Sequence, residues 1–305
     1  MTYSIVIPVY HGENTVEPLF KDIQLFFQNK PYSYEVIFVW DCGDDNSWQV
    51  LQELKEKNEE SIKLIHLARN FGQHNALICG FEYAQGDFII TMDEDLQHCP
   101  ADIAQMINRQ KEGDFDVVYG KYEELKHSSY RNLTSRVFKK VIALGIPELH
   151  NDYSAFRLIK SDTAKACVEM HNSYTFLDGY LSWITSNVGV CIVSHNERLS
   201  GSSSYNTKKL INHSINVFVT FSDLPIRLLS KFSIVLLSLT FLFAIYILLR
   251  KLIVNDLALG YPSLILSICF GVGVILLALG VIGEYIYRIN LKTTKRPNYI
   301  VKITM

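Results

Sequence analysis

The first third of the chain alternates short apolar runs with amphipathic stretches. The apolar runs are rich in Ile, Val and Phe and end in polar residues, as buried strands do. The stretch after the first run repeats its apolar residues at helical spacing, and further helices are expected at 48–57 and up to Tyr83. This β-α-β alternation predicts an α/β fold with a mostly parallel, doubly wound sheet. The predicted strands are 4–10, which we expect to stop at a proline, 34–40, 62–67 and the run from 88.

The last quarter of the chain holds two long apolar segments. Residues 232–249 and 263–282 contain no charged side chain, and each is long enough for a membrane-spanning helix. Two buried core helices are the alternative, but such helices rarely lack charge over this length. We therefore expect a hairpin that crosses a lipid bilayer twice.

Positive charge is concentrated on one side of this predicted hairpin. Lys and Arg accumulate before the first apolar segment and after the second, which predicts that both termini are cytoplasmic. The segment just before the hairpin mixes basic and apolar residues, as interfacial helices do. The expected organisation is a catalytic domain at 1–205, juxtamembrane amphipathic helices at 206–230, a transmembrane hairpin at 231–287 and a cytoplasmic tail at 288–305.

The run at 88–97 ends in two carboxylates, Asp93 and Asp95, separated by one residue. In α/β folds, ligands bind at the carboxyl ends of strands. Two carboxylates there can converge on one Mg²⁺ or Mn²⁺, which prefer oxygen ligands and usually also bind substrate phosphates. One such spacing is expected by chance in a chain of this length, and we expect a second pair, Asp114 and Asp116, to occupy a solvated turn. The strand at 34–40 ends in another acidic loop, which begins at Asp41.

Composition narrows the class of protein. The formal net charge of the 305 residues is -2, which gives no polycationic surface for nucleic acid. The six cysteines have no paired spacing, as expected of reduced cytoplasmic thiols, and the chain begins on a strand without a signal peptide. A dinucleotide-binding glycine fingerprint is absent after the first strand. We expect the three tryptophans, Trp40, Trp48 and Trp183, to be packing residues.

Several short motifs follow one another in a fixed order along the chain. They are Pro8 to Tyr10, the Asp41 loop, 69–72 (Arg-Asn-Phe-Gly), 92–97, 156–158 (Phe-Arg-Leu), Glu197 with Arg198, Gly201 with Ser203, and the tail at 296–299. This ordered combination resembles glycosyltransferase family 2 along essentially the whole chain. The two apolar segments and the tail narrow the resemblance to polyprenyl-phosphate glycosyltransferases, including bactoprenol glucosyltransferases and, more distantly, dolichol-phosphate mannose synthases.

This resemblance implies a GT-A fold and an inverting transfer of sugar from a nucleotide sugar to a polyprenyl phosphate. It places the base near Asp41 and implies that Asp93 and Asp95 bind the metal, with Asp95 the more direct ligand. A homo-oligomer is a further expectation from the family. The residues implied in binding the nucleotide sugar are Pro8, Tyr10, Glu13, Asp41, Arg69 and Gln97.

The acceptor is itself an anion, so cations are expected on its side of the site. Arginine can hold phosphate with two parallel hydrogen bonds, which makes Arg131, Arg136, Arg157 and Arg198 the candidates. Bactoprenol glucosyltransferases often carry Asp directly before Phe-Arg-Leu, where this chain has alanine. Asp152 matches the other acidic position of that motif, so either Asp152 takes a base-like or sugar-binding role or no side-chain base is needed.

Two other functions compete with this one. A family 2 transferase that extends a cell-surface polysaccharide would carry a Gln-x-x-Arg-Trp motif, and the sequence around Trp183 lacks its Gln and Arg. A non-enzymatic scaffold for lipid-linked sugars would have no reason to retain Asp41, Asp93, Asp95 and Arg157. The leading hypothesis is therefore a membrane-bound glycosyltransferase.

Overall fold

The computed structural model describes most of the predicted catalytic domain and one long C-terminal helix. The described residues are 1–28, 30–122, 146, 148–172, 174–194, 216–217, 220–222, 260–293 and 297–305, with single positions between 231 and 249. The candidate residues Arg131, Arg136 and Arg198 lie outside these ranges.

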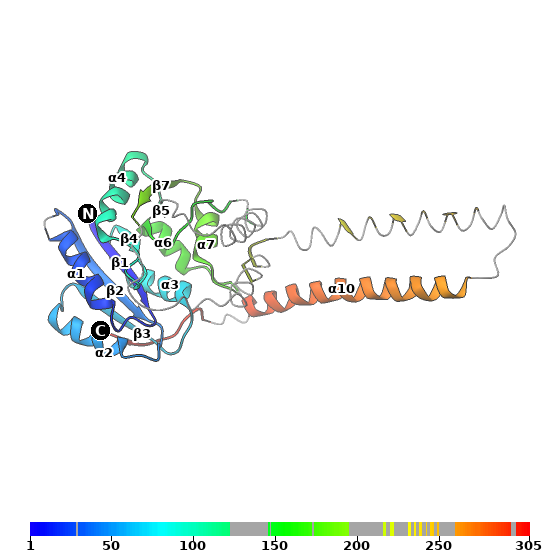
Figure 1. The fold of residues 1–305 in the computed structure, drawn as a ribbon, viewed down its shortest axis with the longest axis horizontal. Coiled ribbons are helices and arrows are strands. Elements are labelled where there is room, and N and C mark those ends of the chain that lie inside the picture. Colours follow the sequence, from blue (N-terminus) through cyan, green and yellow to red (C-terminus); the bar gives the residue numbers. More distant parts are fainter. Residues whose placement is uncertain are drawn as a thin grey trace.

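An eight-stranded sheet forms the centre of the domain, in the order β7-β5-β6-β4-β1-β2-β3-β8 (Figure 1). The neighbours β4, β1, β2 and β3 are parallel, which confirms the predicted α/β fold, whereas β6 and β8 run antiparallel to their neighbours. The strands are β1 (Thr2–Val9), β2 (Ser33–Trp40), β3 (Ile62–Leu67), β4 (Phe88–Thr91), β5 (Val117–Tyr122), β6 (Arg157–Lys160), β7 (Val188–Val193) and β8 (Val301–Thr304).

The expectation that Pro8 stops the first strand was wrong. Strand β1 continues to Val9, and Pro8 is buried in register with Val39 of β2. Proline lacks a backbone N–H and is normally excluded from central strands. It is tolerated here because the pairing of β1 with β4 ends at Val6, two residues before the proline.

Helices cover both faces of the sheet and create two hydrophobic cores. Alternate side chains of β1 and β2 point to opposite faces: Ile5 and Phe38 belong to one core, and Val6 and Val39 to the other. A side chain on Gly80 would clash with Val6, since an added Cβ lies 2.3 Å from Val6 Cγ1, so one helix packs directly on β1. The helices are α1 (Val16–Phe27), α2 (Ser47–Lys57), α3 (Gln73–Tyr83), α4 (Ile103–Gly113), α6 (Ser161–Val168) and α7 (Leu177–Ile184), with a short 3-10 helix, η1 (Pro100–Asp102).

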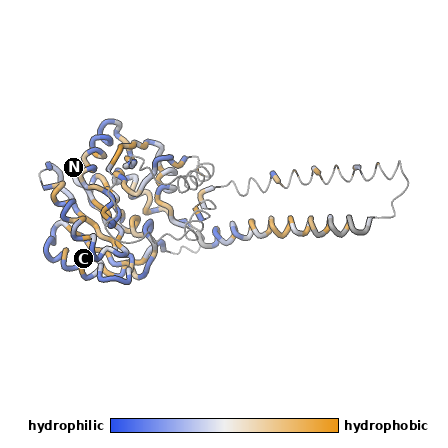
Figure 2. The backbone as a smooth tube through the Cα atoms, in the orientation of Figure 1, coloured by the Kyte–Doolittle hydropathy of each residue, from blue (hydrophilic) through white to orange (hydrophobic). Residues whose placement is uncertain are grey.

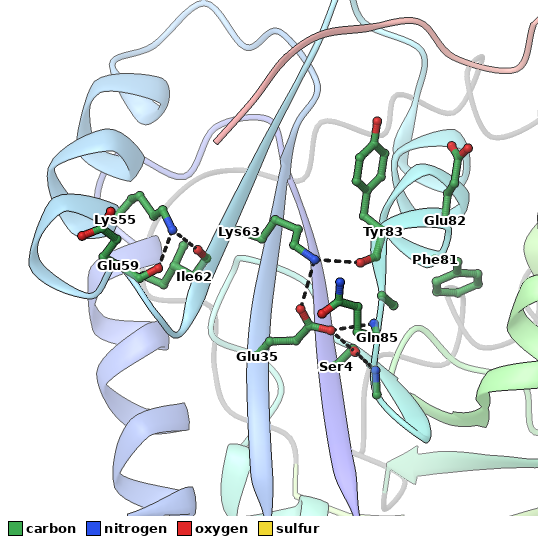
Figure 3. A network of polar contacts seen from close by, with 12 residues as sticks. Ser4, Glu35, Lys55, Glu59, Ile62, Lys63, Phe81, Glu82, Tyr83 and Gln85 are labelled. Atoms are coloured by element: carbon green, nitrogen blue, oxygen red, sulfur yellow. Dashed lines mark hydrogen bonds and ion pairs between the residues drawn. The ribbon is translucent and has the colours of Figure 1, made fainter.

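A polar network closes the amino-terminal edge of the parallel strands (Figure 3). The Glu35 carboxylate accepts hydrogen bonds from Ser4 Oγ at 2.6 Å and from the Gln85 backbone N–H at 2.7 Å. Lys63 Nζ lies 3.3 Å from the same carboxylate and donates to the Tyr83 carbonyl at 2.9 Å. This network joins β1, β2, β3 and the end of α3, and it leaves the carboxyl edge for ligands.

The C-terminal region extends from the domain as a long helix, α10 (Tyr261–Thr293) (Figure 1). Within it, Phe270–Asn290 has a mean hydropathy of 1.9 and none of its most apolar window is buried. Figure 2 shows the hydrophobic colour along this helix. Among the described residues α10 is the one helix that is long and apolar enough to cross a membrane. The other predicted span, 232–249, falls mostly outside the described residues.

The end of the chain is part of the sheet, which the prediction of a simple tail at 288–305 did not foresee. Helix α10 continues to Thr293, and β8 then pairs antiparallel with β3 through Leu67 with Val301 and His66 with Ile303. Because β8 enters at the carboxyl end of β3, the segment after α10 reaches the domain at the edge where ligands bind in α/β folds.

Candidate active site

An acidic turn follows β4 at the carboxyl edge of the sheet. Its backbone reverses at Leu96, whose φ of 62° is unusual for a residue with a side chain. Asp95 Oδ1 accepts the N–H of Gln97 at 3.2 Å, which closes the turn locally. The turn therefore holds Asp95 and Gln97, two of the predicted site residues, close together.

Asp93 is fixed from both its backbone and its side chain. Its N–H donates to Nδ1 of the buried His98 at 3.0 Å, and its Oδ1 accepts from Gln73 Nε2 at 2.6 Å. Gln73 is the first residue of α3, so the start of that helix faces the acidic turn. Gln73 carried no recognisable signal in the sequence.

Between the two aspartates, Glu94 makes the turn more acidic still. Its Oε1 accepts the Tyr10 N–H at 3.4 Å, which connects the turn to the loop after β1. Burial and the neighbouring Asp93 raise the pKa of Glu94 to about 7. Burial is the larger cause of this shift and the charge of Asp93 adds to it, so a cation bound at the turn would favour the ionised form of Glu94.

Asp41 clamps the loop that precedes α3. Its two carboxylate oxygens accept the N–H groups of Phe71 and Gly72, at 2.6 and 2.8 Å. Burial raises the pKa of Asp41, and these two hydrogen bonds oppose the shift. Gly72 has φ 88°, a conformation that favours glycine, and the exposed Arg69 guanidinium lies 4.6 Å from the centre of the Phe71 ring. The geometry therefore gives Asp41 a role in shaping the Arg69 loop.

The loop after β1 contacts the loop after β2. A Cβ on Gly43 would lie 1.6 Å from the Tyr10 carbonyl oxygen, so the two backbones touch and only glycine fits. Glu13 accepts hydrogen bonds from Asn46, through its backbone N–H at 3.4 Å and its side-chain amide at 3.2 Å. The Tyr10 ring is 40% exposed at the rim of this arrangement. The loops thus bring Tyr10, Glu13 and Asp41 to one edge.

Arg157 has a partner that the sequence did not reveal. Its guanidinium binds Asp178 through two parallel hydrogen bonds, Nε to Oδ1 at 2.8 Å and Nη2 to Oδ2 at 2.7 Å. Arg157 is 3% exposed and Asp178 2%. Burial alone would lower the pKa of Arg157, but Asp178 holds it above its ordinary value. The guanidinium is thus held by Asp178 inside the domain, and the contact of Arg157 with the acceptor phosphate stays a prediction.

The same guanidinium supports the strand that carries the acidic turn. Arg157 Nη1 donates to the Ala155 carbonyl at 3.0 Å and to Thr91 Oγ1 at 3.3 Å, and Thr91 Oγ1 itself donates to the Ala155 carbonyl at 2.7 Å. Thr91 is the last residue of β4, directly before the turn. The pair of Arg157 and Asp178 therefore reaches the acidic turn through one residue.

The end of β5 positions Asp152: Lys121, in this strand, forms an ion pair with Asp152, with 3.0 Å between Nζ and Oδ1. Tyr122, the last residue of β5, stacks on His98 with 6.1 Å between the ring centres. Burial, together with the charges of Asp93 and Asp95, raises the pKa of Tyr122. The end of β5 is therefore within the electrostatic reach of the acidic turn.

The second Asp-x-Asp pair has surroundings of a different kind. Asp114 ends α4 in the left-handed conformation and its side chain is 85% exposed. Lys160 forms ion pairs with both Asp114 and Asp116, at 3.0 Å each. A solvated turn was expected for this pair, and the exposure of Asp114 agrees with it.

The acidic turn suits a divalent cation that is shared with a substrate. In the part of the chain that the structure describes, no three His, Cys, Asp or Glu side chains gather as a complete metal site. Mg²⁺ usually binds through one or two carboxylates and completes its shell with water and substrate phosphates. Asp93 and Asp95 match that donor set.

Comparison with known proteins identifies the fold and the class of enzyme. The model of glycosyl transferase family 2 matches residues 4–165, which include the loops after β1, β2, β3 and β4. This chain belongs to glycosyltransferase family 2. Its sequence is similar to that of the putative glycosyltransferase CsbB of Bacillus subtilis, with 32% identity over 98% of this chain and 91% of that protein. It is also similar to the prophage bactoprenol glucosyl transferase homolog of Escherichia coli, with 29% identity over 99% of both chains.

The fold is also found in a solved structure. Glucosyl-3-phosphoglycerate synthase from Mycobacterium tuberculosis, in complex with Mn²⁺, UDP-glucose and phosphoglyceric acid, aligns with a TM-score of 0.54 over 72% of this chain and 78% of that chain. The identity is 15%, so this likeness concerns the fold alone. Together the comparisons confirm the expected class, a nucleotide-sugar glycosyltransferase with a GT-A-like α/β fold.

Proposed function

We propose that this family 2 enzyme transfers a sugar from a nucleotide sugar to a polyprenyl phosphate at the cytoplasmic face of a membrane, with inversion at the anomeric carbon. One observation carries the proposal: the chain returns from the apolar helix α10 to the edge of the sheet that bears the acidic turn. The Ala68 N–H donates to the Ile300 carbonyl at 2.8 Å, directly before Arg69. A bilayer around α10 would therefore lie near the carboxyl ends of the strands.

The apolar surface of α10 supports this membrane anchor. Many apolar side chains of the helix are half exposed or more, among them Leu264, Val272, Leu276 and Ile286, at 58%, 50%, 63% and 61%. Exposed apolar area costs roughly 25 cal/mol per Å² in water, so a helix of this kind needs a bilayer or a partner. Segment 232–249 would supply the second crossing of the proposed hairpin. The E. coli relative named a bactoprenol glucosyl transferase homolog matches over 99% of this chain, which supports the lipid acceptor.

For the donor, we assign the loops at the carboxyl edge of β1, β2 and β3. The exposed Tyr10 and Arg69 would contact the nucleotide. Pro8 and Glu13 would hold the loop after β1 in place, and Asp41 would hold the loop after β3. Gln97, closed onto Asp95 by its N–H, would border the sugar. The base is the part of the donor nearest Asp41.

For the reaction, Asp93 and Asp95 would hold Mg²⁺ or Mn²⁺. The ion would neutralise the charge that develops on the departing nucleoside diphosphate. The acceptor is a phosphate oxygen, which is anionic near neutral pH and needs little help from a general base. Asp152, paired with Lys121, is the side chain we assign to a base-like or sugar-binding role.

The acceptor's own charge needs compensation. We assign the lipid phosphate to Arg131, Arg136 and Arg198, which lie outside the described residues. Arg157 would act indirectly, by fixing Thr91 and thereby the acidic turn.

The test is a product analysis with the full chain in lipid nanodiscs. Purified enzyme is incubated with undecaprenyl phosphate and a panel of UDP-, GDP- and dTDP-sugars, with Mg²⁺, with Mn²⁺ or with EDTA, and the lipids are analysed by mass spectrometry. We expect a polyprenyl phosphate that has gained one sugar, formed with either metal and lost with EDTA. A short-chain alkyl phosphate serves as the control acceptor. No glycosylated lipid with any donor would overturn the proposal.

A further inference from the structure

Trp183, for which a packing role was expected from the sequence, lies at the surface of the domain and packs on one side against Phe221. It belongs to α7, whose other side is buried through Tyr180 and Leu181, and it is itself 46% exposed. Figure 1 shows α7 on the side of the domain from which α10 extends. A large aromatic side chain that remains exposed in this place calls for an explanation.

A continuous set of contacts connects Trp183 with α10. The ring of Phe221 lies 4.7 Å from that of Trp183 and packs so closely on α7 that a Cβ on Gly179 would meet Phe221 Cε1 at 2.4 Å. The residues on either side of Phe221 bind α10. Thr220 Oγ1 accepts from Arg288 Nη1 at 2.7 Å, and the Ser222 carbonyl accepts from Tyr285 OH at 3.3 Å.

These contacts place Trp183 near the C-terminal part of α10. Tyr285 and Arg288 lie near the C-terminal end of the apolar stretch Phe270–Asn290. Tyr and Arg in this position are typical of the boundary between hydrocarbon and headgroups. Because Trp183 contacts Phe221, and the neighbours of Phe221 in the chain bind Tyr285 and Arg288, Trp183 lies close to the same end of the apolar stretch.

We infer that α7 is a second membrane contact of the enzyme, with Trp183 inserted among the lipid headgroups. The indole combines a broad apolar ring with one N–H donor, and tryptophan is enriched at this depth for that reason. The occupant is the bilayer surface, because the patch is continuous with the end of α10 that emerges from it. This inference rests on the membrane anchor in the proposed function and is independent of the sugar and the acceptor.

Such a contact would have a functional consequence. Asp178, the partner of Arg157, lies on α7 five positions before Trp183, about one and a half turns of helix. Anchoring α7 at the headgroups would fix the distance between the bilayer surface and the strand edge that carries Asp93. A phosphate at the end of a lipid would then meet the site at a constant height.

Tryptophan fluorescence tests this placement directly. The chain has three tryptophans, so subtracting the emission of Trp183→Phe from that of the wild type isolates Trp183. Both proteins are placed in nanodiscs of phosphatidylcholine that is either unmodified or brominated on the upper part of its acyl chains. We expect the brominated lipid to remove most of the Trp183 emission. Equal Trp183 emission in the two lipids would overturn the inference.

A matched variant separates this inference from the membrane anchor. In Trp183→Phe, a second change, Leu279→Trp, places an indole on the exposed surface of α10 within the apolar stretch. Lipid brominated near the ends of its chains should quench this indole. Quenching at 279 without quenching at 183 overturns the α7 contact and leaves the anchor standing. Absence of quenching at both positions overturns the anchor and the contact together. Thermal midpoints equal to that of the wild type show that the variants are folded.

Discussion

Arg157 and Asp178 form a buried ion pair with two hydrogen bonds, at 2.8 and 2.7 Å, across the first turn of α7 and the start of β6. Tyr119 adds a third contact, with its OH donating to Asp178 Oδ1 at 3.1 Å. The pair supports Thr91, which precedes the acidic turn. It therefore links the packing of α7 to the geometry of the proposed metal site.

Removing one member of this pair should destabilise the domain strongly. Asp178→Ala leaves an uncompensated buried charge on Arg157, for which a cost of about 3–5 kcal/mol is typical. The double change Arg157→Met with Asp178→Leu should cost less than the single change, because no charge remains to be desolvated. Denaturant unfolding of the domain, followed by near-ultraviolet circular dichroism, measures both.

An exposed ion pair is the control for this experiment. Lys21 and Glu17 lie 3.8 Å apart with side chains 69% and 51% exposed, and Lys21→Ala should cost about 0–1 kcal/mol. If Asp178→Ala cost no more than Lys21→Ala, the buried pair would not have the importance that its geometry indicates.

The two Asp-x-Asp pairs make a matched test of the metal site. Asp95→Ala should lower turnover about 100-fold or more, the scale seen when one group that stabilises transition-state charge is removed. Asp114→Ala changes the same residue type in a solvated turn and should leave turnover close to that of the wild type. Mg²⁺ and Mn²⁺ titrations of the initial rate measure both variants. Equal turnover in the two would remove Asp95 from the metal site.

Asp41→Asn should weaken donor binding through the Arg69 loop. Asp41 accepts hydrogen bonds from two backbone N–H groups, one at each carboxylate oxygen. Asparagine keeps one acceptor oxygen, but its NH₂ group would face the other N–H, donor against donor. A loss of about 1–2 kcal/mol corresponds to a rise of roughly 5–30-fold in the KM for the nucleotide sugar. Asp44→Asn, at a position 90% exposed in the same acidic loop, is the control. A donor KM that changes equally in both would show that the clamp is unimportant.

The pH dependence of stability should have a contribution from Asp116. Burial would raise the pKa of its carboxyl group, but hydrogen bonds from Thr185 and Lys160 lower it below the ordinary value. A lowered pKa in the folded state stabilises the fold above the unfolded pKa of about 4, and this stability is lost as the pH falls further. Asp116→Asn should therefore lower the thermal midpoint at pH 7, and the difference from the wild type should shrink as the pH falls below about 4. A constant difference between the two proteins across this range would contradict the prediction.

The sequence predicted the parts of the fold that depend on local patterns. The apolar run at Ile5, Val6 and Ile7 on β1, and the helical spacing from Val16 to Phe27, are local signals, and both elements were found, although β1 continues past Pro8 to Val9. The strands β6 and β8 have four residues each and pair with segments far away in the chain. Their sequences are too short for a hydrophobic periodicity that would predict a strand. The C-terminal strand was therefore taken for a tail.

The candidate site shows the same division. Asp93, Asp95 and Asp41 follow strands, and their places at one edge could be expected from the parallel sheet. Asp178 lies 21 residues from Arg157, in a helix that gave no sign of its role. A charged pair formed by tertiary packing leaves no spacing in the sequence, so the partner of Arg157 could be found only in three dimensions.

The strand β8 should protect the edge of β3 and hold the end of α10 against the domain. The Leu64 N–H donates to the Met305 carbonyl at 2.9 Å, and the Ala68 N–H to the Ile300 carbonyl at 2.8 Å. Deleting residues 301–305 removes the first partner and leaves the second at a frayed end. Hydrogen exchange followed by mass spectrometry should then show faster exchange in peptides of β3. Peptides of β7, at the other edge of the sheet, should exchange as before.

A point variant distinguishes the loss of β8 itself from a looser connection to α10. Tyr299 OH donates to Glu82 Oε2 at 2.6 Å, and Tyr299→Phe removes this bond while the strand residues stay in place. Exchange in β3 should change little in this variant, because its backbone partners remain. If Tyr299→Phe speeds exchange as much as the deletion does, β8 is held by the side chain of Tyr299 and its ladder with β3 contributes little. If neither change affects β3, the paired edge would have no part in its protection.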